Sequence, residues 1–344
     1  MEGALRPALA AIAAGQYGLF RRQQAIVGGY SPEEIRARLG RRGDWLALRR
    51  GVYLPQQQWE RGGDTERAWW VDVAAHLEMT LPHLLSHDSA ARGLGIPIVA
   101  ARSQLTHVTR AGVGGSRTRH GVKHHLGREH PADVALREGI PMTGPARTAL
   151  DLAREHGFAT GVVAVDAVLH RGTGHRAFEQ ELARMTSWPH VRTCRAAFEF
   201  ADGRAESPGE SLTRILLGEL GWGPLDLQFP IPVRGGVRWC DLRIGRHIVE
   251  FDGKVKYVPR ALGGVAELDA WEVAWNDRIR DTDVSSLGLG ISHVTWGDLF
   301  AGREATKVRL LKEEAATRLR FGRELPEELS RFAASHPRRT APAA

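Results

Sequence analysis

The sequence predicts an α/β protein made of modules that each combine helices and strands. The chain has 344 residues, enough to bury two or three cores, and its 42% hydrophobic and 25% charged residues are typical of globular domains. Helical and strand-like hydrophobic periods also alternate along it. We expect five segments: a winged helix at 1–60, a mixed α/β middle domain at 65–185, a connector at 186–205, an α/β sheet domain at 206–302, and a charged helix with a mobile tail at 303–344.

Composition indicates the compartment and the kind of partner. Lysine and arginine outnumber aspartate and glutamate by 47 to 40, which favours a polyanionic partner without proving one. The two cysteines, Cys194 and Cys240, are too few for a disulfide framework or a thiolate zinc site and favour a reducing compartment. The short run LAAIAAG does not look like a secretory signal, and no apolar stretch approaches membrane-spanning length. We therefore expect a cytoplasmic protein with no membrane contact.

The first 60 residues predict three short helices followed by a hairpin. In SPEEIRARLG, Ser31 is a good N-cap, Pro32 suits the first helical position, Glu34 completes a capping box and Gly40 ends the helix. The preceding LFRRQQAIVGGY gives a short helix that ends in two glycines, so the two helices have helix-turn-helix proportions. DWLALRRGVYLP then alternates into two strands around Gly51, which completes the outline of a winged helix.

The same region is strongly basic. Residues 21–50 contain eight arginines against three acids, and neutralising DNA phosphates requires such a cluster. The alternative is a solvated basic face. Arg36 and Arg38 cannot both face one groove edge-on. The residues expected to contact DNA are Arg36, Arg38, Arg41, Arg42, Arg49 and Arg50.

The middle region predicts alternating helices and strands, with strands at QLTHVTR and GVKHHLG and a helix starting at Thr143 or Pro145. The run Ser86–Ser89 (SHDS) contains the residue types of a hydrolase triad, but adjacent residues cannot adopt the triad's geometry. We interpret it as a helix start capped by Ser86 or Asp88. The histidines match no metal-ligand spacing, and two neighbours on a strand point oppositely, so we expect these side chains at the surface: His120, His124 and His125.

The region after residue 206 predicts an amphipathic helix, PGESLTRILLGELGW, and then strands. VRWCDLRIGRHIVEFDG reads as a hairpin with Gly245 and Arg246 as the turn. That turn pairs Ile244 with His247, Arg243 with Ile248, Leu242 with Val249, and Asp241 with Glu250. Alternation then places Cys240, Leu242, Ile244, Val249 and Phe251 on one apolar face, and Asp241, Glu250 and Asp252 on the other.

Opposed carboxylates destabilise a sheet unless a cation lies between them. A divalent ion held by Asp241 and Glu250 would turn the repulsion into attraction, and an oxygen-only ligand set suits Mg²⁺ or Mn²⁺ better than zinc. The alternative is a solvated sheet face whose acids repel one another mildly.

These motifs, in this order, resemble the DUF559 family, whose domains are similar to very-short-patch-repair and other PD-(D/E)XK nucleases. The resemblance covers roughly residues 200–300 and rests on Glu206, Ser207, Glu210, Asp241, EFDGK at 250–254, DRIRD at 277–281, Leu287, Gly288 and HVTWGDL from His293. It implies a restriction-endonuclease-like α/β sheet domain that hydrolyses phosphodiester bonds with Mg²⁺. Asp241 and Glu250 would then be the metal ligands and Glu210 a third acid.

The sequence departs from the wider nuclease motif, which has Glu-x-Lys, because Asp252 occupies the lysine position. Lys254, two residues further on, would supply the missing cation, and it or a metal-bound water would serve as the base. His293 stands where many relatives carry arginine. The missing lysine at position 252 favours a binding role for the same fold, whereas the pairing of Asp241 with Glu250 favours the enzyme.

The N-terminal region resembles a second family, the winged-helix domain of AbiEi-type antitoxins of type IV toxin-antitoxin systems. The resemblance rests on GLFRRQQAIVGGY, the helix after Ser31 and WLALRRGVYLP. Many chains join these two modules through a middle region that contains SHDSAA and GPARTALDLA, as this one does at 86–91 and 144–153. The resemblance implies contact with DNA and a toxin or defence-system partner, and a homodimer is compatible with it. Our first hypothesis is a DNA-binding, metal-dependent endonuclease, and the alternative is a non-catalytic AbiEi-like antitoxin or transcriptional regulator. A third, weaker hypothesis is a genome-defence or mobile-element component that acts only with a partner protein.

Overall fold

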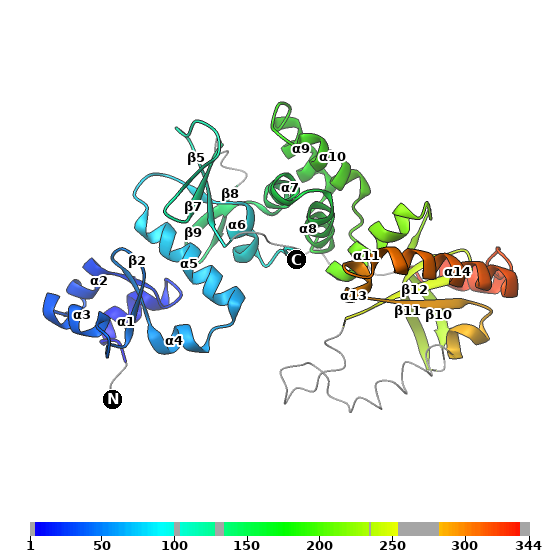
Figure 1. Cartoon of the computed structure of the whole chain (residues 1–344), viewed down its shortest axis with the longest axis horizontal. Coiled ribbons are helices and arrows are strands. Elements are labelled where there is room, and N and C mark those ends of the chain that lie inside the picture. The colour runs from blue at the N-terminus through cyan, green and yellow to red at the C-terminus, as the bar shows by residue number, and fades with distance from the viewer. Residues whose placement is uncertain (1–3, 100–103, 128–133, 234, 254–281, 338–344) are drawn as a thin grey trace. The chain divides into compact units, whose positions relative to one another are not determined.

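The computed structural model describes residues 4–99, 104–127, 134–233, 235–253 and 282–337. The chain divides into two compact units, one made of Met1–Ala164 and His175–Phe198 and the other of Val165–Gly174 and Glu199–Ala344. Both units combine helices with strands, so the predicted α/β class is confirmed (Figure 1). Two units are a coarser division than the five predicted segments, whose individual boundaries stay predictions.

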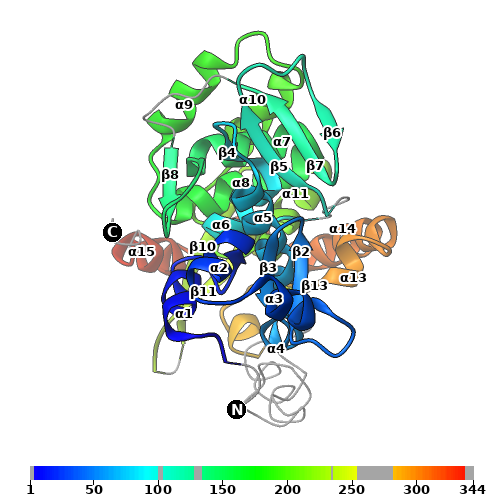
Figure 2. The same ribbon diagram turned by 90° about the vertical axis from the view of Figure 1, so that its left-hand side faces the viewer.

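The N-terminal part of the first unit has the fold of a winged helix (Figure 2). The structure confirms the predicted capping box, because Ser31 Oγ accepts the N–H of Glu34 at 3.2 Å and Glu34 accepts the N–H of Ser31 at 2.7 Å. A short strand joins the hairpin, giving the order β1-β3-β2. The elements are α1 (Pro7–Ala14), β1 (Phe20–Arg21), α2 (Arg22–Val27), α3 (Pro32–Leu39), β2 (Trp45–Arg49), β3 (Val52–Pro55) and α4 (Gln56–Arg61).

Aromatic packing holds the winged helix together. Phe20 contacts Trp45 edge-on with ring centroids 4.7 Å apart, and Tyr30 does so at 4.9 Å. Leu9 and Ile35 complete the cluster from α1 and α3. The polar residues of α2 and α3 are therefore left on the outside.

The middle of the first unit is a six-stranded mixed sheet in the order β6-β7-β5-β4-β9-β8. The predicted strands at QLTHVTR and GVKHHLG are confirmed as β5 and β7. The other four were not predicted, because two to four residues give too little alternation to detect. The elements are α5 (Asp64–Glu78), β4 (Leu84–Leu85), α6 (His87–Leu94), β5 (Thr106–Arg110), β6 (Arg117–Arg119), β7 (Val122–Leu126), β8 (Val134–Arg137) and β9 (Ile140–Thr143).

Four helices follow this sheet: α7 (Pro145–His156), α8 (Phe158–His170), α9 (His175–Arg184) and α10 (Val191–Phe200). The helix α10 lies in the predicted connector, yet it packs closely. Cys194 and Ala197 are fully buried, and the Cys194 thiol contacts the backbone oxygen of Leu150 at 3.3 Å. Its buried face makes α10 part of the packed first unit.

The second unit is built on a four-stranded sheet in the order β10-β11-β12-β13, in which β12 and β13 are parallel. The predicted helix and hairpin are confirmed, with Gly245 at a φ of 56° in the turn. The elements are α11 (Pro208–Glu219), β10 (Asp226–Val233), β11 (Gly236–Ile244), β12 (His247–Asp252), β13 (Gly290–Thr295), α13 (Trp296–Leu299), α14 (Arg303–Phe321) and α15 (Glu327–Ser335).

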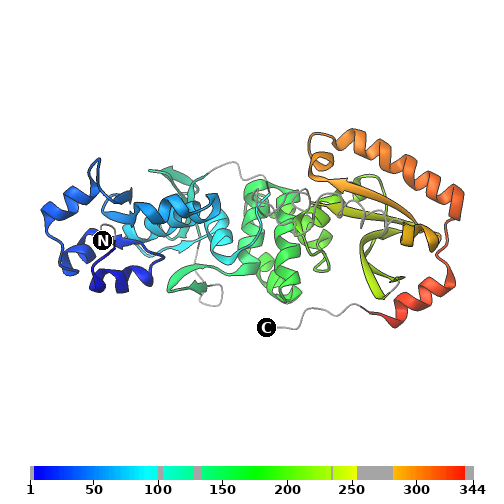
Figure 3. The same ribbon diagram turned by 90° about the horizontal axis from the view of Figure 1, so that it is seen from below.

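The long helix α14, predicted from KVRLLKEEAATRLRFG, runs alongside this sheet (Figure 3). Its Thr317 hydroxyl forms a hydrogen bond of 2.8 Å with the buried His247 ring of β12. The expectation of a mobile end after α14 is wrong for residues 327–335, which form α15. Leu329 of α15 is buried against the sheet beside Ile248.

The start of α11 fits closely over β12, because Gly209 lies against the ring of Phe251. We expect Gly209→Ala to lower the free energy of unfolding of the second unit by about 1–3 kcal/mol, since the added methyl overlaps that ring. Urea unfolding of the purified chain measures this. Gly218→Ala in the same helix is the control, because its methyl would lie 3.4 Å from Phe200, an ordinary contact. Equal stabilities of the two variants would contradict the close fit.

Candidate functional site

Four of the six arginines predicted to contact DNA are exposed on the winged helix. Arg36 lies on α3, Arg41 and Arg42 follow it, and Arg50 stands at the tip of the β2–β3 hairpin beside Gly51, whose φ is 74°. Arg36 is tied to Glu33 at 2.6 Å. This ion pair is fully exposed to solvent, so it competes weakly with a phosphate.

The other two arginines have structural partners. Arg38 pairs with Asp44 at 2.6 Å, and its guanidinium lies 5.4 Å from the centre of the Tyr30 ring. Arg49 donates to the backbone oxygen of His120 at 2.6 Å, and 13% of its side chain is exposed. Arg38 thus supports the winged helix itself, and Arg49 joins its hairpin to the middle region. The DNA contacts of all six arginines stay predictions.

The acidic hairpin follows the predicted register up to a point. Ile244 pairs with His247, Arg243 with Ile248, and Leu242 with Val249, as the turn predicts. The described ladder of β11 and β12 ends there, one position before Asp241 and Glu250. The carboxylate of Asp241 instead accepts the backbone N–H of Phe251 at 2.8 Å.

The predicted faces therefore need a correction. The sequence placed Cys240 on the face opposite Glu250, whereas the Cys240 thiol contacts the Glu250 carboxyl group. The pairing of β11 with β12 is regular only as far as Leu242. On the other side of β11, the strand β10 is irregular at Gln228, whose φ is 54°. Beyond Leu242 the side chains of β11 therefore no longer alternate strictly between the two faces.

Each predicted catalytic acid that the structure describes has a protein donor. Arg238 donates to Glu250 at 3.2 Å, and His293 lies 2.7 Å from Asp252. Glu210 accepts from Ser207 Oγ at 2.8 Å and from Gln228 Nε2 at 2.9 Å. These carboxylates are thus held by a network of hydrogen bonds and ion pairs.

The electrostatics of the acids show that they lie near one another. Burial raises the pKa of Glu210, and the charge of Glu250 raises it further, against the hydrogen bonds from Ser207 and Gln228. Burial also raises the pKa of Glu250, with Asp252 adding to it and Arg238 opposing it. Carboxylate oxygens are the right donor type for Mg²⁺, but Arg238 already contacts one of the two oxygens of Glu250. The Mg²⁺ or Mn²⁺ site stays a prediction, as do the catalytic roles.

Part of the predicted nuclease site lies outside the described residues. These positions are Lys254 and the DRIRD segment at 277–281. Their roles stay predictions.

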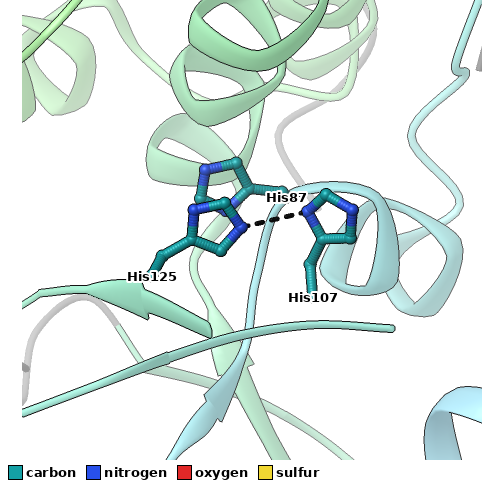
Figure 4. A group of neighbouring side chains, drawn as sticks. All are labelled: His87, His107 and His125. Carbon is teal, nitrogen blue, oxygen red and sulfur yellow. Dashed lines mark hydrogen bonds between the residues drawn. The ribbon is translucent and has the colours of Figure 1, made fainter. Parts of the chain in front are cut away.

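Sequence reasoning missed a cluster of buried histidines in the first unit. His87, His107 and His125 are at most 8% exposed (Figure 4). The expectation that His125 lies at the surface is therefore wrong, whereas His120 is exposed as predicted. The sheet covers one side of the cluster and α6 contributes His87. Ser86 is the N-cap residue of α6, as predicted, but its hydroxyl contacts His87 Nδ1 at 3.1 Å instead of capping the helix.

Comparison with known proteins places a family likeness in this middle region. The family model of the AbiEi antitoxin C-terminal domain matches residues 87–200. The uncharacterized proteins MT2308 and Rv2248, from two strains of Mycobacterium tuberculosis, are each 34% identical to this chain over 98 residues. The match covers 28% of this chain and 36% of the relative. The chain thus spans about a third of the length of these curated relatives.

A solved structure is also similar: the crystal structure of the RV2827C protein from Mycobacterium tuberculosis, with a TM-score of 0.34, 16% identity, and coverage of 62% of this chain and 83% of that one. None of the helices in the described part of the chain has the length and apolar character needed to cross a membrane. The AbiEi likeness that the sequence suggested for residues 1–60 is found after the winged helix, where residues 87–200 match the C-terminal domain of AbiEi antitoxins.

Proposed function

We propose that the protein is a DNA-binding regulator of the AbiEi antitoxin type. The observation that carries the proposal is the order of its parts: a winged helix with exposed arginines precedes a region that matches the AbiEi antitoxin C-terminal domain. A winged helix presents one helix to a DNA groove and its hairpin to the backbone. The matched region is then the part that serves antitoxin function, and a toxin protein is the partner that this family likeness suggests.

DNA contact through this module is mainly electrostatic. Arg41, Arg42 and Arg50 lie at the end of α3 and on the hairpin tip, where they reach phosphates on either side of the groove entered by α3. Arg36 lies on α3 itself, and phosphate would replace Glu33 as its partner. Fluorescence anisotropy with labelled duplex DNA at several salt concentrations tests the proposal. Affinity that does not fall as salt rises would contradict it.

The second candidate is the metal-dependent nuclease. The observation that favours it is the mutual repulsion of Glu210, Glu250 and Asp252, which a cation would relieve. Arg238 provides a protein cation at Glu250 and the His293 ring contacts Asp252, so both acids already have partners without a metal ion. A regulator that uses this fold only for binding requires no metal ion at these acids, so we favour the antitoxin-type function.

We expect the purified protein to bind duplex DNA without cleaving it. Supercoiled, linear, nicked and single-stranded DNA are incubated with Mg²⁺ or Mn²⁺ beside a Glu250→Gln variant, and the products are resolved on gels. The expected result is unchanged DNA in every lane with a retained gel shift. Metal-dependent cleavage by the natural sequence that the variant lacks would establish the nuclease instead.

A further inference from the structure

Three histidines from separate segments converge inside the first unit. His87, His107 and His125 each offer a ring nitrogen, and these three atoms all lie within 4.8 Å of one another (Figure 4). Nε2 of His125 is 3.1 Å from Nδ1 of His107. Two nitrogen ligands of one tetrahedral zinc ion lie about 3.3 Å apart, given Zn–N distances of about 2.0–2.1 Å. The distance between these nitrogens of His125 and His107 is therefore close to that between two ligands of one ion.

The fold fixes these positions. The strands β5 and β7 are parallel neighbours, with His107 paired to Lys123 and Thr109 to His125, so the two histidines project from the same face of the sheet. His87 comes two residues after the end of β4, at the start of α6, and its side chain lies over that face. Its φ of 48° is a strained value for a residue with a side chain, which marks a backbone held in place by its surroundings.

A carboxylate lies behind the cluster. Nε2 of His107 points away from His125 and lies 3.7 Å from Oδ2 of Asp88. Both atoms are buried and have no hydrogen-bond partner, although the other oxygen of Asp88 is bound by His156 at 2.6 Å. A carboxylate facing the second nitrogen of a histidine is the usual support for a metal-ligating ring.

We propose that His87, His107 and His125 form a binding site for one zinc-type divalent ion, with Asp88 orienting His107. Imidazole ligands favour zinc over magnesium, and three protein ligands leave a fourth position open. The rings of His87 and His125 are stacked, 3.7 Å apart and 14° from parallel, so their nitrogens lie side by side. The His87 ring therefore turns toward the other two nitrogens when the ion enters.

The test is a titration of chelator-treated full-length protein with Zn²⁺, using Co²⁺ absorption to report tetrahedral coordination and Mg²⁺ as the negative control. We expect one equivalent of Zn²⁺ per chain. Asp88→Asn should weaken binding about 10–100-fold, and His107→Gln or His125→Gln by at least as much. His124→Gln is the matched control on the same strand: its ring accepts from Arg110 at 3.3 Å and lies outside the group, so affinity should not change.

No binding of Zn²⁺ by the natural sequence overturns the proposal, as does binding that His124→Gln weakens while His107→Gln and His125→Gln do not. Where a cluster variant fails to fold, X-ray absorption of the zinc-loaded natural protein decides: three imidazole ligands support the site, and a shell dominated by oxygen overturns it. The inference is independent of the proposed function, because the arginines of the winged helix are not part of it and DNA binding is measured separately.

Discussion

Replacing Arg41, Arg42 and Arg50 together by glutamate is expected to weaken duplex DNA binding several hundredfold at 0.1 M salt. Each phosphate contact contributes about 0.9 to the slope of log affinity against log salt, so three contacts are worth roughly 500-fold between 0.1 M and 1 M salt. The slope itself should fall by nearly three units. Anisotropy titrations at several salt concentrations measure both quantities, and the three side chains are exposed, so the fold should be unaffected.

The control must change charge equally elsewhere in the first unit. Arg176, Arg192 and Arg195 are exposed on α9 and α10, and their reversal to glutamate should lower affinity much less than reversal of Arg41, Arg42 and Arg50. A general attraction between a basic protein and DNA would reduce affinity equally in both variants. That outcome would remove the winged helix as the DNA-binding surface.

Arg49 is a poor choice for this experiment, although the sequence places it beside Arg50. Its guanidinium donates to the backbone oxygen of His120 and lies 3.9 Å from Glu78. Reversing its charge would disturb the packing of the hairpin on the middle region and confuse lost folding with lost phosphate contact.

Local features of the fold were predictable from sequence. The capping box of Ser31 and Glu34 and the turn at Gly245 depend on residues within a few positions of each other, and the structure confirms both. The winged-helix outline followed from such local signals in the correct order. The sheet order of the middle region did not, because four of its strands are too short to show a period.

The partners of the candidate site residues were not predictable, since they come from distant segments. The sequence identified Glu250 and Asp252 as acids in need of a partner, but not that Arg238 and His293 are these partners. The histidine cluster was missed for the same reason: His87, His107 and His125 follow no ligand spacing and meet only through the parallel pairing of β5 with β7. The available signal was one histidine on each of the strands β5 and β7 and a third at the start of α6.

Asp166→Ala is expected to destabilise the second unit by about 3–5 kcal/mol, the usual effect of removing one partner of a buried ion pair. Asp166 and Arg214 are joined at 2.6 Å with side chains 2% and 6% exposed. Asp166 also accepts the backbone N–H of Asp202 at 2.7 Å, and Arg214 lies 4.5 Å from the centre of the Phe200 ring. Without Asp166, the guanidinium is left buried with no opposite charge.

The two cysteines make this prediction measurable in each unit separately. Cys194 lies in the first unit and Cys240 in the second, and both are fully buried, so thiol labelling reports the opening of each unit. Labelling of Cys240 should become roughly 140–3,700 times faster in Asp166→Ala, since every 1.4 kcal/mol is a factor of ten, while Cys194 is unchanged. Arg204→Gln is the control: its ion pair with Asp202 is half exposed, so Cys240 labelling should change less than about fivefold.

The double variant Asp166→Leu with Arg214→Met separates the lost charge from the lost packing. It removes both charges and fills their space with apolar groups, and replacing a buried ion pair in this way is often neutral or stabilising. We therefore expect it to recover most of the stability that Asp166→Ala loses. A double variant as unstable as Asp166→Ala would mean that the surrounding hydrogen bonds, rather than the buried charge left behind, hold α8 to α11 in the second unit.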